Sequence, residues 1–556
     1  MSENATSHKS WNVWLPLMLA VVMVAGMVAG VFLQDNPPTI TAVDVKVVKE
    51  ASLPPSTLGQ GKLEEIIRYI EARYVDEVNK EDLVREAMDK ILHELDPHSS
   101  YISAEELNSV NEQLEGSFEG IGIEFILVND TVTVVSLMDG SPALKVGIRS
   151  GDQIVGVNDT LRIGKNAKGD RILQVLKGER GSKVRLEVWR PSERKAYRYT
   201  LTREKIPVKS VSAYFMQDED CGYIRIDRFT AHTFEEFMSA MEELVERKGM
   251  QNLILDLRQN PGGYLQEAVN ILSQFFKEKD KLLVYTQGSH SPKTEYKSTG
   301  RNFYDLKNIS VLVDEGSASA SEILAGAVQD WDRGVIIGRR TFGKGLVQEQ
   351  YPLRDGSAIR LTVARYYTPS GRCIQKPYGR QSNYEEELSN RLTSGEMYDA
   401  TKIATSDSLV YSTSKGRKVY GGGGIVPDVF IPYDSLELNT YYIQLSQHIP
   451  GFVFRYLEQQ REALSGMGLE TFVSSYSVPS ELRQQFLAYT RRNGLAYDAT
   501  NWRRVQSKVA MQIKAHIARQ LWGEAGYRMV LNQSDPAVAA ALEYNHYKDP
   551  IAALGR

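Results

Sequence analysis

The sequence predicts a mixed α/β protein, with a β-rich module ahead of its core and a helical region behind it. Strand-like and helix-like segments alternate between about residues 208 and 432. Short β-rich runs, separated by Gly, Asp and Asn turns, fill residues 116–205, and apolar residues recur at helical spacing on both sides. Alternation of this kind is typical of buried strands that are covered by helices.

The first residues predict a membrane anchor. Residues 11–33 carry no charged side chain, and this length exceeds the roughly 20 residues that a helix needs to span a bilayer. A cleaved signal peptide usually has a shorter apolar region, so we expect an uncleaved signal-anchor, with residues 1–10 as a cytoplasmic tail and 34–61 as a linker. Cleavage of the segment stays the alternative. The expected location is the cytoplasmic (inner) membrane, single-pass, with the rest of the chain on the periplasmic side.

Helical regions are predicted both before the β-rich module and after the α/β core. Residues 62–115 are predicted as an N-terminal helical region, because apolar residues follow helical spacing at Leu63, Ile66, Ile67, Ile70 and Tyr74. Residues 436–556 are predicted as a helical C-terminal domain, with a second stripe at Trp502, Val505, Val509, Ile513 and Ile517. We find no chemistry in this last region, and expect it to serve packing or contacts within a homo-oligomer.

The β-rich module and the core are predicted from their apolar runs. In the module, strands are expected at 132–135, 153–157 and 184–189, with a helix-like segment at 172–176. In the core, residues 206–435, buried strands are expected at 253–257, 309–313 and 335–337, with helices that begin near 265 and 320.

Composition excludes several classes of protein. The net charge of −4 gives no basic excess, so a nucleic-acid partner is not expected. The two cysteines, Cys221 and Cys373, lie far apart and form no CxxC pattern, which argues against a disulfide framework and a zinc site. Neither a metal nor a cofactor is expected, because the serine chemistry considered below needs neither.

The segment Gly316–Glu322 is the first candidate for chemistry. It leaves a predicted strand and enters a predicted helix with the letters GSASASE. Small residues permit a sharp turn that exposes a hydroxyl where free N–H groups and the helix dipole favour an anion. Acyl transfer needs such a place, because a tetrahedral oxyanion forms beside the nucleophile. A serine-rich helix cap is the simpler alternative, and the segment alone does not decide between them.

A serine nucleophile also needs a base, and Lys344 is the better candidate. It lies between two glycines in an otherwise apolar segment. Burial would have to lower the lysine pKa from about 10.4 by about 3 units, a cost of roughly 4 kcal/mol to the ionised form. Gln348 could orient the amine without adding charge. A surface lysine is the alternative for Lys344, and a histidine base, His98 or His290, stays open because triad members are neighbours only in space.

A third motif ends another predicted strand with the letters DLRQNPGG, residues 256–263. A Pro-Gly-Gly turn at this place can aim a backbone N–H outward as an oxyanion donor. Taken alone, the motif indicates only a turn.

Together these motifs resemble the C-terminal processing peptidases, also called tail-specific proteases. The resemblance covers about residues 62–435. Its motifs are LDPHSSY from Leu95, GYIRI from Gly222, the PGG turn, GSASASEILAGA from Gly316, TFGKG from Thr341, ARYYTPSGR from Ala364 and GIVPD ending at Asp428.

The resemblance implies a serine endopeptidase that works through an acyl-enzyme. It makes Ser319 the nucleophile, Lys344 the base and Gln348 an assisting residue. The implied oxyanion donors are backbone N–H groups of three residues, Ala320, Gly262 and Gly263. The implied fold is a crotonase-like peptidase core with an inserted β-rich PDZ domain, an N-terminal helical region and a helical C-terminal extension.

The same resemblance assigns a peptide-binding role to the module over residues 116–205. Its carboxylate-binding loop would be Gly120, Ile121, Gly122 and Ile123. Such a loop holds the terminal carboxylate of a peptide that adds as an edge strand, which implies substrates with accessible C-terminal tails. Two other classes fit less well. An inactive PDZ adaptor predicts loss of Ser319 or Lys344, and a crotonase-type acyl-CoA enzyme would need neither the module nor Lys344.

Overall fold

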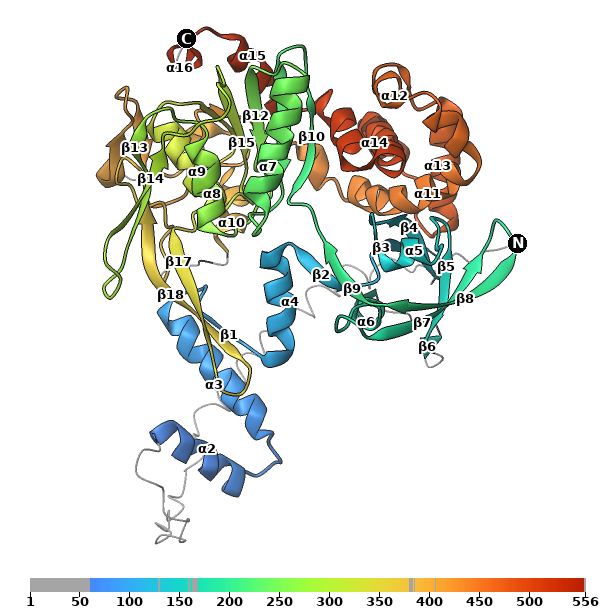
Figure 1. The fold of residues 1–556 in the computed structure, drawn as a ribbon, viewed down its shortest axis with the longest axis horizontal. Coiled ribbons are helices and arrows are strands. Elements are labelled where there is room, and N and C mark those ends of the chain that lie inside the picture. The colour runs from blue at the N-terminus through green and yellow to red at the C-terminus, as the bar shows by residue number, and fades with distance from the viewer. Residues whose placement is uncertain are drawn as a thin grey trace, which may run out of the picture. The chain divides into compact units, whose positions relative to one another are not determined.

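The computed structural model describes residues 61–128, 131–158, 161–162, 169–379, 384, 386–405 and 407–554 (Figure 1). The predicted anchor at 11–33, the tail before it and residues 34–60 of the linker lie outside the described residues. Within the described ranges, no helix has the length and apolar character needed to cross a membrane. The chain divides into two compact units, Met1–Val84 and Arg85–Arg556.

The first unit contains α2 (Lys62–Arg73) and the start of α3 (Lys80–Leu95). The helix predicted from the first apolar stripe is therefore present. Its stripe is not a buried face, however, since Ile67 is buried while Leu63 and Ile66 are 45% and 54% exposed. Helical spacing predicted the helix correctly but does not reveal what, if anything, covers its apolar side.

The core of the second unit is a six-stranded sheet. In order across the sheet its strands are β10 (Val211–Met216), β11 (Cys221–Ile226), β12 (Asn252–Asp256), β15 (Ile309–Val313), β16 (Val335–Gly338) and β21 (Val429–Phe430). Only β10 runs antiparallel to its neighbour. The strands predicted in the core are confirmed, and β12 and β15 are buried along their whole length, as their continuous apolar runs indicate.

Helices cover both faces of this sheet (Figure 1). Successive side chains of a strand point to opposite faces. Leu253 and Leu255 pack with α7 (Thr233–Glu242), α8 (Leu265–Ser273) and α9 (Ala320–Asp330), whereas Ile254 packs with α15 (Pro536–His546) and α16 (Pro550–Ala553). Each such side chain adds about 1.5–3 kcal/mol to the free energy of unfolding when it is fully buried. Since the strands are parallel, the turns that follow β12 and β15 meet at one edge.

A second, antiparallel sheet lies beside that edge. It contains β1 (Ser100–Ile102), β18 (Ala358–Tyr367), β13 (Lys279–Gln287) and β14 (Thr294–Thr299), and β17 (Leu346–Pro352) pairs with β18. The β17–β18 hairpin continues the chain directly after Lys344. The strand β1 brings the LDPHSSY motif to the same hairpin, because Tyr101 pairs with Ile359. Helix α4 (Ala104–Glu115) follows, capped by Ser103.

The β-rich module folds around one sheet of its own. Its strands are β3 (Ile123–Val128), β4 (Thr131–Leu137), β5 (Gln153–Val157), β7 (Lys183–Arg190) and β8 (Lys195–Thr202), with β6 (Leu161–Arg162) paired to β5. Two short helices complete it, α5 (Pro142–Lys145) and α6 (Gly169–Leu176), and the ribbon β2 (Ser117–Gly120)–β9 (Glu204–Pro207) joins it to the core. The predicted strands and the segment at 172–176 are confirmed.

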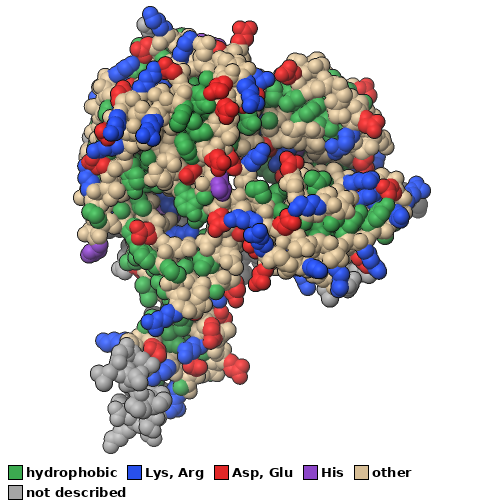
Figure 2. Space-filling view, in the orientation of Figure 1, with side chains coloured by type: hydrophobic (Ala, Val, Ile, Leu, Met, Phe, Trp, Pro, Cys, Tyr) green, Lys and Arg blue, Asp and Glu red, His purple; other side chains and the backbone are tan. Residues whose placement is uncertain are grey.

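The C-terminal region is helical, as predicted. Its main helices are α11 (Thr440–Ser465), α12 (Leu469–Ser475), α13 (Ser480–Arg492) and α14 (Ala499–Asn532), and α10 (Glu387–Ser394) precedes them. All five residues of the predicted stripe on α14 are buried in the core that α14 shares with α11. The sequence did not predict the break at Trp522 and Gly523, where Gly523 adopts a φ of 72° that favours glycine. Figure 2 shows cationic and anionic side chains interspersed over the visible face, in keeping with the small net charge.

Candidate active site

The turn between β15 and α9 singles out one hydroxyl of three. Ser317 is fully buried, and its Oγ donates to the carbonyl of Leu257 at 2.8 Å. Ser321 is also fully buried, and its Oγ donates to the carbonyl of Asn260 at 3.0 Å. Ser319 alone is partly exposed, and it lines a cleft of about 490 Å³. The outer serines therefore hold the turn, and the middle one is free for chemistry.

The backbone of Ser319 is strained. Its φ of 56° and ψ of −115° lie in a region that residues with a side chain rarely adopt. Such conformations cost about 1–3 kcal/mol and persist where the surroundings hold them. Here the strain places the hydroxyl at the N-terminal end of α9, where N–H groups are free of helical partners.

Lys344 and Gln348 line the same cleft as Ser319. The Lys344 Nζ donates to Gln348 Oε1 at 2.9 Å, and Gln348 Nε2 donates to the carbonyl of His98 at 2.6 Å. Burial lowers the pKa of Lys344, and the nearby Arg360 lowers it further. A lysine in these surroundings releases its proton more readily than an exposed one, which a general base requires.

His98, the alternative base, does not line the cleft. Its Nε2 shares a 2.6 Å hydrogen bond with the hydroxyl of Tyr384. Burial and the charge of Lys344 lower the pKa of His98 to about 4. The LDPHSSY motif instead holds Gln348 through a backbone carbonyl, and Asp96 fixes that segment by accepting from the N–H groups of His98 and Ser99. His290, the other alternative, is exposed in the turn between β13 and β14.

A buried carboxylate ties the serine turn to the lysine segment. Glu322 is 0% exposed and accepts four hydrogen bonds. One oxygen accepts from the N–H groups of Ser319 and Lys344, both at 2.9 Å. The other accepts from Thr341 Oγ1 and from the N–H of Gly343. Burial raises the pKa of Glu322 to about 7, and the four donors oppose that rise.

Tyr366 makes a second connection between the same two segments. Its hydroxyl lies within hydrogen-bonding distance of the carbonyl oxygens of Ser319 and Lys344. Sequence reasoning assigned no role to Tyr366 or Glu322. The signal for Glu322 was present, because a Ser followed three residues later by Glu is a capping-box pattern. Tyr366 lay inside the ARYYTPSGR motif, but no local pattern indicates which of its residues faces the cleft.

The Pro-Gly-Gly turn packs directly against Ser319. A Cβ on Gly262 would lie 2.7 Å from the Ser319 Cβ, so only glycine fits there. The Gly262 N–H donates to Asn260 Oδ1 at 2.8 Å. Among the described residues, the N–H groups of Gly263 and Ala320 have no hydrogen-bond acceptor. Both glycines line the cleft, and Ala320 is the first residue of α9 behind Ser319.

The predicted peptide-binding loop lies in the β-rich module. Gly120 ends β2, Ile123 begins β3, and Gly122 between them has a φ of 72°. The carbonyls of Ile121 and Gly122 accept from the N–H groups of Ala143 and Met138, which fixes the loop. Strand β3 ends the order of its sheet, so its outer edge carries no partner strand among the described residues.

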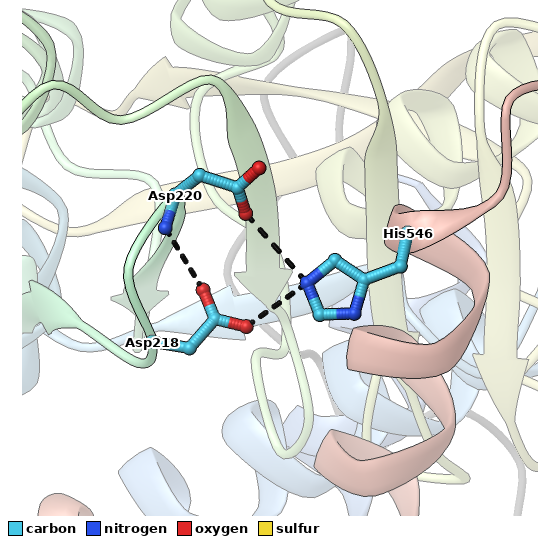
Figure 3. Close-up of side chains that lie close together, drawn as sticks. All are labelled: Asp218, Asp220 and His546. Atoms are coloured by element: carbon cyan, nitrogen blue, oxygen red, sulfur yellow. Dashed lines mark hydrogen bonds and ion pairs between the residues drawn. The ribbon is translucent and has the colours of Figure 1, made fainter.

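One three-residue cluster in the described chain could hold a metal ion, and it lies elsewhere (Figure 3). His546 Nε2, near the end of α15, lies 3.1 Å from Asp218 Oδ2 and 3.6 Å from Asp220 Oδ1. Both aspartates precede β11 and therefore lie at the amino ends of the parallel strands, whereas Ser319 lies beyond their carboxyl ends. A five-residue strand spans roughly 16 Å, so this cluster takes no direct part in chemistry at Ser319.

Comparison with known proteins identifies the family. Residues 220–385 match the model of peptidase family S41, residues 120–201 match a PDZ domain, and residues 441–523 match a family of unknown function. The chain is 33% identical over 401 residues to the carboxy-terminal-processing protease of Bartonella bacilliformis. The aligned region covers 70% of this chain and 89% of that protein. The chain belongs to the C-terminal processing peptidases.

A second relative and one solved structure are also similar to this chain. The carboxy-terminal processing protease CtpB of Bacillus subtilis is 34% identical over 356 residues, covering 63% of this chain and 72% of that protein. The photosystem II D1 C-terminal processing protease has a solved structure that is 28% identical, with a TM-score of 0.35, covering 67% of this chain and 87% of that one. The two domain matches and the two relatives make this C-terminal processing peptidase a serine-type protease with a PDZ domain.

Proposed function

We propose that this peptidase cleaves peptide bonds with a Ser319–Lys344 dyad through an acyl-enzyme. The observation that carries the proposal is the shared cleft. It contains the one partly exposed hydroxyl of the serine turn together with a lysine whose pKa burial lowers. Serine–lysine pairs are a known variant of the nucleophile and base arrangement. Within the described residues no hydrogen bond joins Ser319 Oγ to Lys344 Nζ, and such contacts often tighten only when substrate binds.

In the proposed mechanism, neutral Lys344 takes the proton of Ser319 Oγ as that oxygen bonds to the scissile carbonyl carbon. Lys344 then passes the proton to the amine nitrogen, the C–N bond breaks, and an ester to Ser319 remains. Water attacks the ester and Lys344 takes its proton. Lys344 then returns that proton to Ser319 Oγ as the bond between Oγ and the acyl carbon breaks, and the carboxylic product leaves. Gln348 accepts one N–H of the amine, which turns the nitrogen lone pair away from itself.

The proposed oxyanion donors are the N–H groups of Ala320 and Gly263. Both lack an acceptor among the described residues, and both belong to segments that flank Ser319. Because the Gly262 N–H already donates to Asn260, we assign Gly262 the role of permitting close approach. Removing one such donor typically costs about 100- to 1,000-fold in turnover.

We propose that the PDZ domain captures the C-terminal tail of protein or peptide substrates. The free edge of β3 and the loop from Gly120 to Ile123 support this role, since a peptide strand can add there with its carboxylate at the loop. We also propose the crotonase-like type for the core, supported by a parallel sheet with helices on both faces. The uncharged residues 11–33 support an inner-membrane anchor with the peptidase on the periplasmic side.

The test is casein cleavage by residues 61–556, comparing wild type with Ser319→Ala and with Lys344→Ala. Both variants should fold and lose activity. If Lys344→Ala retains substantial turnover, the base is another residue and the dyad is wrong. To test the location, a reporter enzyme that functions only outside the cytoplasm is fused after residue 34, and it should be active. Activity of a reporter that functions only in the cytoplasm, fused at the same place, would refute the proposed orientation.

A further inference from the structure

The active-site cleft carries positive charge that no acidic side chain balances. Among the described residues, its charged lining residues are Arg228, Lys344 and Arg360, and neither Asp nor Glu lines it. With Lys344 neutral, as its role as a base requires, two guanidinium groups remain. On the face of the molecule that Figure 2 shows, by contrast, cationic and anionic side chains are interspersed.

In the part of the chain that the structure describes, both arginines have neutral partners only. Arg228, in the turn between β11 and α7, donates to Gln113 Oε1 at 3.2 Å. Arg360, on β18, donates to Gln350 Oε1 at 3.2 Å. Within the described ranges, neither forms an ion pair with a carboxylate. A guanidinium has five N–H donors in a planar fork that matches a carboxylate, so most donors of each arginine are available to a ligand.

The position of Arg360 makes this arrangement costly without a ligand. Its side chain is partly buried, and burial lowers the pKa of Arg360. Taking a charge out of water is unfavourable unless a counter-charge is supplied. Arg417, which is partly buried like Arg360, receives one from Asp332. Arg333 is also partly buried and has no ion pair among the described residues, but its guanidinium donates to three backbone carbonyls. Among the described residues, Arg360 has neither a carboxylate nor several carbonyls as acceptors, so a counter-charge is missing at the cleft that it lines.

We infer that the cleft selects substrates that place a carboxylate beside the scissile bond, with Arg228 and Arg360 as its specificity-determining residues. This inference rests on the proposed function, because it assumes that cleavage takes place at Ser319. The carboxylate can come from an acidic side chain or from a nearby chain terminus. Both sources present the same planar group to a guanidinium fork.

The experiment first maps the bonds of β-casein that the full-length wild-type protein, solubilised in detergent, cleaves. Quenched fluorescent peptides around one such bond then carry Glu or Gln at successive positions, with amidated ends. At one or two positions, kcat/KM for the Glu peptide should exceed that for the Gln peptide by about 10- to 100-fold, the range expected of a charge-assisted hydrogen bond. A parallel series compares free and amidated C-termini, and thereby separates the two sources of carboxylate.

The variants are Arg228→Gln and Arg360→Gln, and the readout is the Glu/Gln ratio rather than activity itself. Each should lower the ratio by about tenfold, whereas Arg228→Lys and Arg360→Lys should keep part of it because they keep the charge. Taking a ratio cancels any effect of Arg360 on Lys344. The matched control is Arg354→Gln, an exposed arginine in the β17–β18 turn that does not line the cleft, and it should keep the wild-type ratio.

Two failures are distinguishable. If Ser319→Ala still cleaves these peptides, the proposed function is wrong. If Ser319→Ala is inactive but wild type cleaves Glu and Gln peptides, and free and amidated termini, within twofold of each other, the peptidase assignment stands and the carboxylate preference is refuted. A ratio that survives both Gln variants would equally overturn the role of the two arginines.

Discussion

Glu322→Gln tests whether a buried carboxylate positions the proposed dyad. The change keeps the size of the side chain but replaces one acceptor oxygen with an NH₂ group. In one orientation the NH₂ faces the N–H groups of Ser319 and Lys344, and in the other it faces Thr341 and Gly343. Either orientation sets donors against donors in a site that is closed to water.

The expected losses of stability and turnover follow from the two donors that lose their acceptor. Each buried N–H left without an acceptor costs about 1–3 kcal/mol, and the neutral amide recovers part of this because no charge is then buried. We expect the free energy of unfolding to fall by about 1–3 kcal/mol. We expect kcat to fall by about 100-fold, because a shift of about 1 Å between reacting groups has that effect. The KM should change little, since Glu322 does not line the cleft.

The assay is peptide turnover at pH 8, above the pKa of about 7 for Glu322, together with urea unfolding. Glu236→Gln is the control. Glu236 also accepts backbone N–H groups, from Ser210 and Val211, but contacts neither catalytic segment. That variant should keep its kcat. If Glu322→Gln loses stability but keeps kcat within twofold of wild type, Glu322 holds the fold and does not position the dyad.

Three further outcomes are expected. As pH rises, kcat/KM should increase, because Lys344 loses its proton. Arg360→Gln removes a positive charge that lowers the pKa of Lys344, so in this variant the increase should occur at higher pH. A shift of the increase to lower pH would contradict the argument. Gly262→Ala should reduce the burst amplitude and kcat by at least about 100-fold, because the added Cβ would lie 2.7 Å from the Cβ of Ser319. Near-normal turnover would show that the Pro-Gly-Gly turn shifts without loss of activity. EDTA should leave turnover unchanged, since the cluster around His546 lies at the other edge of the sheet; an activity loss that zinc restores would give that cluster a role.

Local sequence was sufficient wherever a residue is defined by its neighbours along the chain. Buried strands such as β12 and β15, the helix that begins at Ala320 and the stripe on α14 each follow from hydrophobic period, and the structure has them. The strained turn at Ser319 follows from the run of small residues. The apolar stripe on α2 shows the limit, because period predicts a helix but not what packs against it.

Other features depend on contacts between distant segments. The sequence could nominate Ser319, Lys344 and Gln348, but not the carbonyl of His98 that orients Gln348 from 250 residues away. It offered Gly262 and Gly263 equally as donors, and the side chain of Asn260 distinguishes them. Likewise the residues opposite Arg228 and Arg360 are set by how α4 and β17 pack, and no pattern along the chain reveals that no carboxylate is among them.

The sequence by itself thus determined the order of elements, the family to which this peptidase belongs and its candidate nucleophile and base, because short-range periodicity and contiguous motifs encode them. Only the tertiary structure decided which serine is accessible, which N–H groups lack acceptors among the described residues, and how Glu322 and Tyr366 join the segments of the proposed nucleophile and base. Burial, hydrogen bonding and uncompensated charge are properties of the space around an atom. Residues remote in the chain fill that space, and their positions follow from the packing of the whole fold.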